Sequence, residues 1–156
     1  MEYSIMLDGD ITDRYIADAI LHAKGMNQKV VVFIDTGAFN TMVDMQYAKD
    51  FGALLPLHMH IAIGGRELKT QACILHKVVM GDLVMEQVFA LACPFKDWLR
   101  GHILLGLNVM NNWDFTISRS DNKMRLIERI PEIAPNKTEP YRNYFKNGKY
   151  IALQEI

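Results

Sequence analysis

The chain has 156 residues, of which 50% are hydrophobic and 22% charged, which is the composition of one packed globular domain and not of a disordered chain. The 17 Lys and Arg residues nearly balance the 18 Asp and Glu residues, so no basic excess attracts nucleic acid or an anionic membrane. The apolar runs are too short to cross a bilayer as helices, and two Cys residues do not suggest a secreted disulfide scaffold. We therefore expect a cytoplasmic protein that binds neither nucleic acid nor a membrane.

The first third of the chain alternates apolar runs with turn residues. Residues 15–22 fit a helix or a strand, and residues 23–28 hold Gly and Asn between apolar runs, which predicts a turn. Residues 30–34 are β-branched and aromatic, so we expect a strand that is buried on both faces. A short helix is predicted over residues 44–51, with Gly52 as its end.

The middle of the chain consists of short strand patterns separated by tight turns. Gly64-Gly65 and Gly81-Asp82 are turn signals, and residues 107–112 fit one or two helical turns. Strands are expected at residues 61–63, 68–75, 83–91, 103–105, 115–118 and 124–127. Many short strands with one or two small helices predict an all-β domain.

The tetrapeptide Asp35-Thr36-Gly37-Ala38 directly follows the predicted buried strand. An ionised carboxylate is costly to bury unless it is paired or hydrogen-bonded, so a functional use is one explanation for its position. The other is that Asp35 forms a turn at the strand end and caps its own backbone. The tripeptide Asp-Thr-Gly alone leaves both interpretations open.

A second element, Ile103 to Asn108, is an apolar strand closed by Gly106 and followed by a short helix. Together with Asp35-Thr36-Gly37-Ala38 it resembles the signature of the retropepsin-like aspartic proteases. The resemblance spans residues 15–127 and implies a closed β-barrel with one or two short helices that forms a homodimer. Residues 1–14 are then an N-terminal extension, and residues 128–156 are a C-terminal extension.

The resemblance implies an aspartic endopeptidase that hydrolyses polypeptides without a metal or organic cofactor. Two adjacent carboxylates can share a proton, so that one activates a water molecule while the other protonates the carbonyl oxygen. The chain has one such motif, so two chains must each supply Asp35. In this family Thr36 would bond across the dimer, Gly37 would admit the substrate backbone, and Ala38 would keep the site small.

A β-hairpin covers the substrate in this family, and Ile61 to Lys69 is the best candidate for it here. Gly64 and Gly65 at its tip would allow the hairpin to open. Beside the tip, Ile63 and Arg66 are the expected substrate contacts.

Two positions depart from the retroviral members of the family. Those members have Asp directly after Asp-Thr-Gly-Ala and Arg directly after the later Gly, whereas this chain has Phe39 and Leu107. Replacing both partners of a buried ion pair with apolar residues can be neutral or stabilising, which fits a drier dimer interface. The same change also fits a non-catalytic protease-fold module for binding or assembly.

His58 and His60 alternate along a predicted strand and therefore face the same side, as two metal ligands would. No third ligand is evident nearby in the sequence. We therefore expect no metal site there.

Overall fold

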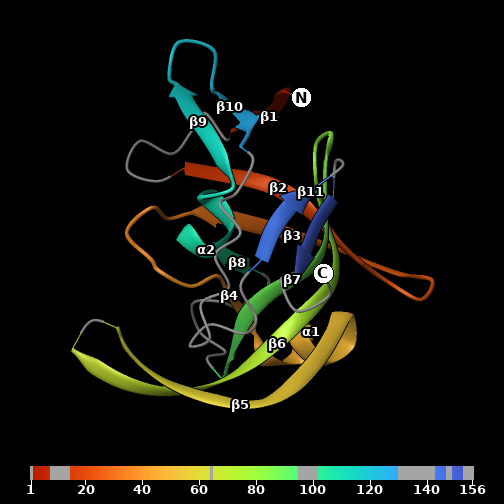
Figure 1. Ribbon diagram of the computed structural model, residues 1–156, viewed down its shortest axis with the longest axis vertical. Coiled ribbons are helices and arrows are strands. Elements are labelled where there is room, and N and C mark those ends of the chain that lie inside the picture. Colours follow the sequence, from red (N-terminus) through yellow and green to blue (C-terminus); the bar gives the residue numbers. More distant parts are fainter. Residues whose placement is uncertain are drawn as a thin grey trace.

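The computed structural model describes residues 2–7, 15–63, 65–94, 102–129, 143–146 and 149–152. It is mainly β-structure with two short helices, α1 (Met45–Phe51) and α2 (Leu107–Met110) (Figure 1). The strands are β1 (Glu2–Met6), β2 (Tyr15–Ala23), β3 (Met26–Ile34), β4 (Met42–Asp44), β5 (Gly52–Ile63), β6 (Arg66–Met80), β7 (Leu83–Cys93), β8 (His102–Leu105), β9 (Trp113–Ser118), β10 (Lys123–Glu128), β11 (Asn143–Lys146) and β12 (Lys149–Ala152).

Six strands form a closed barrel in the order β2-β3-β8-β4-β7-β6. The barrel closes because β2 also pairs with β6, where Ile20 lies opposite Val79 and His22 lies opposite Lys77. β5 extends the same sheet as an additional strand on β6. The prediction of an all-β closed barrel with one or two short helices is confirmed.

Residues 15–22, which fit either helix or strand from the sequence, belong to β2. Ala17, Ala19 and Leu21 are buried in the barrel core while Asp18 is exposed, so the pattern follows the period of a strand. β2 and β3 are joined by the two-residue turn Lys24-Gly25, whose φ angles are 30° and 81°. Two consecutive residues with left-handed φ angles match the twist of a tight hairpin. The turn predicted within residues 23–28 is present, and it is shorter than expected.

Helix α1 ends at Phe51 as predicted, and it begins at Met45, one residue later than expected. The Asp44 side chain caps it by accepting a hydrogen bond from the Gln46 backbone N–H at 3.0 Å. Gly52 ends the helix and begins β5 with extended backbone. A Cβ atom at this glycine would lie 2.5 Å from the Ile74 carbonyl oxygen, so β5 approaches β6 too closely here for a side chain.

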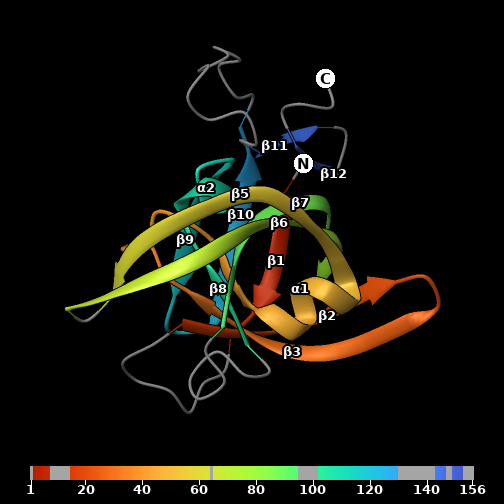
Figure 2. The same ribbon diagram turned by 90° about the horizontal axis from the view of Figure 1, so that it is seen from below.

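The β5–β6 hairpin curves across the molecule as its longest β-structure (Figures 1 and 2). The strand register shifts between Leu54 and His58, around Pro56. Proline has no N–H to donate, and it is tolerated here because β5 is an edge strand. The Gln71 side chain donates a hydrogen bond to the Leu55 carbonyl at 3.0 Å and stabilises the irregular segment.

A three-stranded sheet, β1-β10-β9, packs on the barrel and shares its core. Tyr3 and Ile5 of β1 are buried with Met124 and Leu126 of β10, so a strand from residues 1–14 pairs with the barrel domain. The β11–β12 hairpin lies against β7 (Figure 1).

Among the described residues, neither helix is long and apolar enough to span a membrane.

Candidate active site

The two sequence motifs meet side by side in the barrel. β3 leads into Asp35 and pairs in parallel with β8, so that Ile34 lies opposite Leu105. The Asp35 backbone N–H continues this ladder and donates to the Leu105 carbonyl at 3.0 Å. The end of β8 therefore fixes the position of the aspartate.

The loop after Asp35 crosses the end of β8 before the chain enters β4 on the other side of that strand. Leu107 donates a backbone hydrogen bond to Ala38 at 2.8 Å, and Asn108 donates one to Phe39 at 3.0 Å. A Cβ atom at Gly106 would lie 2.5 Å from backbone atoms of Asn40. The glycine of the second motif is therefore needed because the loop of the first motif passes directly over it.

Asn108 and Thr41 join the two motifs through a buried polar network. The Asn108 Oδ1 atom accepts hydrogen bonds from the Thr41 backbone N–H at 2.7 Å and from the Thr41 hydroxyl at 2.8 Å. The same hydroxyl accepts from the Gly106 N–H at 3.1 Å, and the Asn108 side-chain amide donates to the Phe89 carbonyl at 3.0 Å. Thr41 is fully buried and Asn108 is half-buried, so the network holds the loop by polar contacts that are largely shielded from water.

The sequence analysis missed the role of Thr41. Its sequence signal is weak, because a threonine before a short strand is commonplace in β-proteins.

The Asp35 side chain is half-buried, whereas Thr36 and Gly37 are exposed. Its Oδ1 atom accepts a hydrogen bond from the Gly37 N–H at 2.9 Å, and its carbonyl accepts from the Ala38 N–H at 3.3 Å. The turn that one interpretation of Asp35 predicted is therefore present. It orients the carboxylate at the surface of the loop.

The β5–β6 hairpin covers an apolar cluster that reaches the Asp35 loop. The buried members are Met42, Ala72, Phe89, Leu91, Cys93 and Leu104, and the partly buried residues packed against them are Ala38, Leu55, Leu57, Met59 and Ile61. Four alternate residues of β5 thus pack against the same cluster as Ala38 of the predicted site: Leu55, Leu57, Met59 and Ile61.

The tip of this hairpin is only partly within the described residues. Ile63 and Arg66 are Cα partners at the end of the ladder, and Gly65 has a left-handed φ of 78°. Arg66 is exposed. Gly64 and the side chain of Ile63 lie outside the described residues. The hairpin itself is present where the sequence placed it, and the substrate contacts stay predictions.

His58 and His60 lie on the exposed, outer face of β5. His60 Nδ1 is 3.1 Å from Glu67 Oε1 of β6. Over the described part of the chain, no three His, Cys, Asp or Glu side chains are placed to hold a metal ion.

Both cysteines are buried and free. Burial raises the pKa of the Cys73 thiol to about 12 and that of the Cys93 thiol to about 12. A thiol that stays protonated at neutral pH is a poor nucleophile, so neither cysteine is a catalytic candidate.

Comparison with known proteins agrees with this architecture. The family model described as aspartyl protease matches residues 21–109, more than half of the chain, so the chain belongs to this aspartyl protease family. A solved structure that is similar to it is a retropepsin-like aspartic protease from Rickettsia conorii, with 20% identity and a TM-score of 0.53 over 81% of this chain and 90% of that chain. No curated protein matches the sequence. The chain is thus an aspartyl protease family member whose fold is similar to that of a retropepsin-like protease.

Proposed function

We propose that this protein is an aspartic endopeptidase whose active form is a homodimer with one Asp35 from each chain at a shared site. The observation that carries the proposal is the position of Asp35. Backbone hydrogen bonds from the loop and to β8 fix the aspartate at the junction of both motifs, yet its side chain is only half-buried. Such a carboxylate is rigidly oriented and still accessible to a second chain and to a substrate.

The proposed reaction uses one water molecule between the two carboxylates. The ionised Asp35 takes a proton from water as the water oxygen bonds to the carbonyl carbon, and the protonated Asp35 donates its proton to the carbonyl oxygen. Proton transfer to the amide nitrogen then breaks the C–N bond and releases an acid and an amine. The two carboxylates must be adjacent, because only then do they hold a single proton between them.

Two apolar residues beside the site support the dimer. Phe39 is 65% exposed, and Leu107 is half-buried. The backbone bonds from Leu107 to Ala38 and from Asn108 to Phe39 hold the two positions together. They form an apolar surface next to the exposed Thr36, where the family places its contact between chains. A second copy of the chain would cover this surface.

The apolar cluster under the hairpin supports a preference among polypeptide substrates. Ala38, Leu57, Met59 and Ile61 are partly buried hydrophobic residues on both sides of the predicted substrate position. An apolar side chain next to the cleaved bond would remove more of this surface from water than a charged one. We therefore expect cleavage between apolar residues.

The proposal is tested by digesting a peptide library with the unmodified protein and with the Asp35→Asn variant, and by measuring the products with mass spectrometry. The substitution keeps the size of the side chain but removes its acid-base function, so we expect cleavage to fall about 1,000-fold or more. Asp82→Asn, in the exposed β6–β7 turn, changes the charge equally and should leave cleavage unchanged. Cleavage that survives in Asp35→Asn would refute the proposed role of Asp35.

The dimer is tested by Phe39→Ser. Because Phe39 is exposed in the single chain, we expect the free energy of unfolding of the monomer to change by no more than about 0.5 kcal/mol. The dimer dissociation constant should rise about tenfold or more, because an apolar contact between chains is lost. Sedimentation velocity over a concentration series measures the dissociation constant. An unchanged constant would place the dimer contact elsewhere.

A second candidate function is a non-catalytic binding or assembly module. Phe39 and Leu107 favour it, because the charged pair of the retroviral enzymes is absent. A protein that is strictly monomeric, does not bind pepstatin and cleaves no peptide would be such a module.

A further inference from the structure

Alternate residues of β6 point to the inner face of the β5–β6 hairpin, which is the face that packs on the apolar cluster. Ala72 belongs to this cluster, and Thr70 and Leu68 are buried on the same face. Successive side chains of a strand point to opposite faces, so Arg66 continues this series toward the tip of the hairpin. Arg66 is exposed, so its guanidinium lies on the inner face without being packed into the cluster.

The carboxylate next to Arg66 in the chain lies on the opposite face of the hairpin. Glu67 points outward, and its Oε1 atom is 3.1 Å from His60 Nδ1. Lys69 lies opposite His60 on the same outer face. Of the residues that the structure describes, none forms an ion pair with the Arg66 guanidinium. The inner face of the tip thus presents a cation that is available to a ligand.

The hairpin tip and the Asp35 loop lie on the same side of the molecule. In both views, β5 ends on the side where β3 ends (Figures 1 and 2). Ala38 of the loop and Ile61 of the hairpin pack against the same cluster. Ile61 lies opposite Leu68, and Arg66 is two residues, or about 7 Å, further toward the tip. A peptide held between the loop and the hairpin would therefore pass Arg66 at the edge of the apolar surface.

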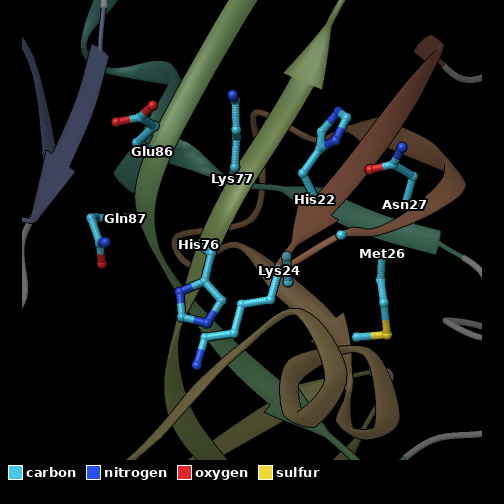
Figure 3. A pocket seen from close by; sticks show the side chains of 10 residues that line it. His22, Lys24, Met26, Asn27, His76, Lys77, Glu86 and Gln87 are labelled. Atoms are coloured by element: carbon cyan, nitrogen blue, oxygen red, sulfur yellow. The ribbon is translucent and has the colours of Figure 1, made fainter.

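The basic side chains around the β2–β3 turn do not converge in a comparable way (Figure 3). His22, Lys77 and Glu86 form a row on one face of the sheet. The Lys24 side chain extends toward His76 on the other face. These groups share no position for one ligand, and the row already contains a carboxylate beside its lysine.

We propose that Arg66 is a specificity-determining residue that selects polypeptide substrates with an acidic side chain, Asp or Glu, near the cleaved bond. The inference rests on the proposed function, because it requires the substrate to lie between the hairpin and the Asp35 loop. An arginine guanidinium binds a carboxylate through two parallel N–H···O hydrogen bonds. The apolar surface would then hold the residues at the cleaved bond, and Arg66 would hold an acidic residue further along the substrate.

The test uses the Asp35→Asn variant, which should bind peptides without cleaving them. Short labelled peptides with two central apolar residues carry Glu, Gln or Lys at each flanking position in turn, and fluorescence anisotropy measures their dissociation constants. We expect Glu to bind about fivefold more tightly than Gln at one flanking position or more. Adding Arg66→Glu should reverse this preference in favour of Lys. The control Lys69→Glu changes the charge equally on the outer face and should keep the preference for Glu.

Three results would overturn the role of Arg66. They are the absence of peptide binding, binding with no preference for Glu at any flanking position, and a preference that Arg66→Glu and Lys69→Glu reduce equally. The last result would show attraction to the overall charge of the hairpin and not to Arg66.

Cleavage by the unmodified protein separates this inference from the proposed function. Cleavage without a preference for acidic residues would refute only the role of Arg66. Selective binding that depends on Arg66, without any cleavage, would refute only the endopeptidase activity and would support recognition of acidic peptides by Arg66.

Discussion

The Asp35 loop and the outer half of the β5–β6 hairpin face the same apolar cluster but are held in different ways. The loop is fixed by backbone hydrogen bonds to β8 and α2 and by the side chains of the buried Thr41 and the half-buried Asn108. Beyond Pro56, the hairpin is held by its own ladder and by apolar packing of its inner face, where Leu68 is buried. His58 and His60 on its outer face are exposed, and Met59 and Ile61 on its inner face are only partly buried.

This difference separates two requirements of a hydrolase of this class. Under the proposed function, the group that performs chemistry must be fixed in orientation, and the hydrogen bonds of the Asp35 loop would achieve this. Under the same proposal, a cover must move to admit a substrate, and the exposed residues Gly65, Arg66 and Glu67 at the hairpin tip would move at the lowest free-energy cost. The molecule thus places a polar network under the loop, whereas the inner face of the hairpin rests on apolar contacts.

The largest effect is expected from Asn108→Leu, which removes the acceptor shared by the Thr41 N–H and hydroxyl. Buried donors without acceptors cost about 1–3 kcal/mol each, so the free energy of unfolding should fall by about 3 kcal/mol or more. Asn108→Asp keeps an acceptor oxygen and loses only the donor to Phe89, so its loss should be about half as large. Urea denaturation measures both values.

The control for this prediction is Asn111→Leu, at the exposed end of the same short helix, which should change the free energy by no more than about 0.5 kcal/mol. If Asn108→Leu and Asn111→Leu were equally stable, the buried network would not be what holds the loop. The contrast between loop and hairpin would then rest on backbone bonds alone.

A smaller effect is expected from Gly65→Ala, and Gly25→Ala is its matched control. Both glycines have a left-handed φ, 78° and 81°, and an added Cβ atom would touch nothing within 4 Å at either. Each variant should therefore lose about 1 kcal/mol of stability. Only Gly65 lies at the tip of the predicted cover, so only Gly65→Ala should raise KM, about threefold. Steady-state cleavage kinetics measure KM, and equal effects of both variants would show that the hairpin does not cover the substrate.

Much of the fold could be predicted from local patterns. The strand at Val30–Ile34, the helix ended by Gly52 and the tight turn at Gly81 each carry a local signal, and all three are present. The strand is buried on one face only, because Val31 and Phe33 on its other face are half-buried. β4 was missed because three residues between a loop and a helix have no periodicity to detect. β1 was missed because its pairing with β10, across most of the chain, is a long-range contact that no local pattern encodes.

The two motifs of the candidate site could be predicted from the sequence, but the contacts that join them could not. Asp35 and Gly106 were found from their order along the chain, and the parallel pairing of β3 with β8 explains why they occur together. The Thr41–Asn108 contact was not predictable, because the two residues are 67 positions apart and both polar types are common at strand and helix ends. The close approach that requires Gly106 is likewise a property of the packed loop.

The smallest effect near neutral pH is expected for chemical labelling of the two buried thiols. Their reactivity reports how far along its length the hairpin opens. Cys73 pairs with Leu54 at the base of the hairpin, and Cys93 pairs with Asp44 in the fixed part of the barrel. Burial raises the pKa of each from 9.0 to about 12, so iodoacetamide at pH 8 should label neither in the native protein and both in urea.

The same shifts determine how stability depends on alkaline pH. Because the folded thiols bind their protons more tightly than the unfolded ones, they do not change the free energy of unfolding below about pH 9, and stability falls as the pH rises from about 9 toward 12. Labelling at pH 8 is therefore free of this effect. If Cys73 were labelled before Cys93 there, the hairpin would open down to its base, and the boundary between fixed barrel and movable cover would lie below Pro56.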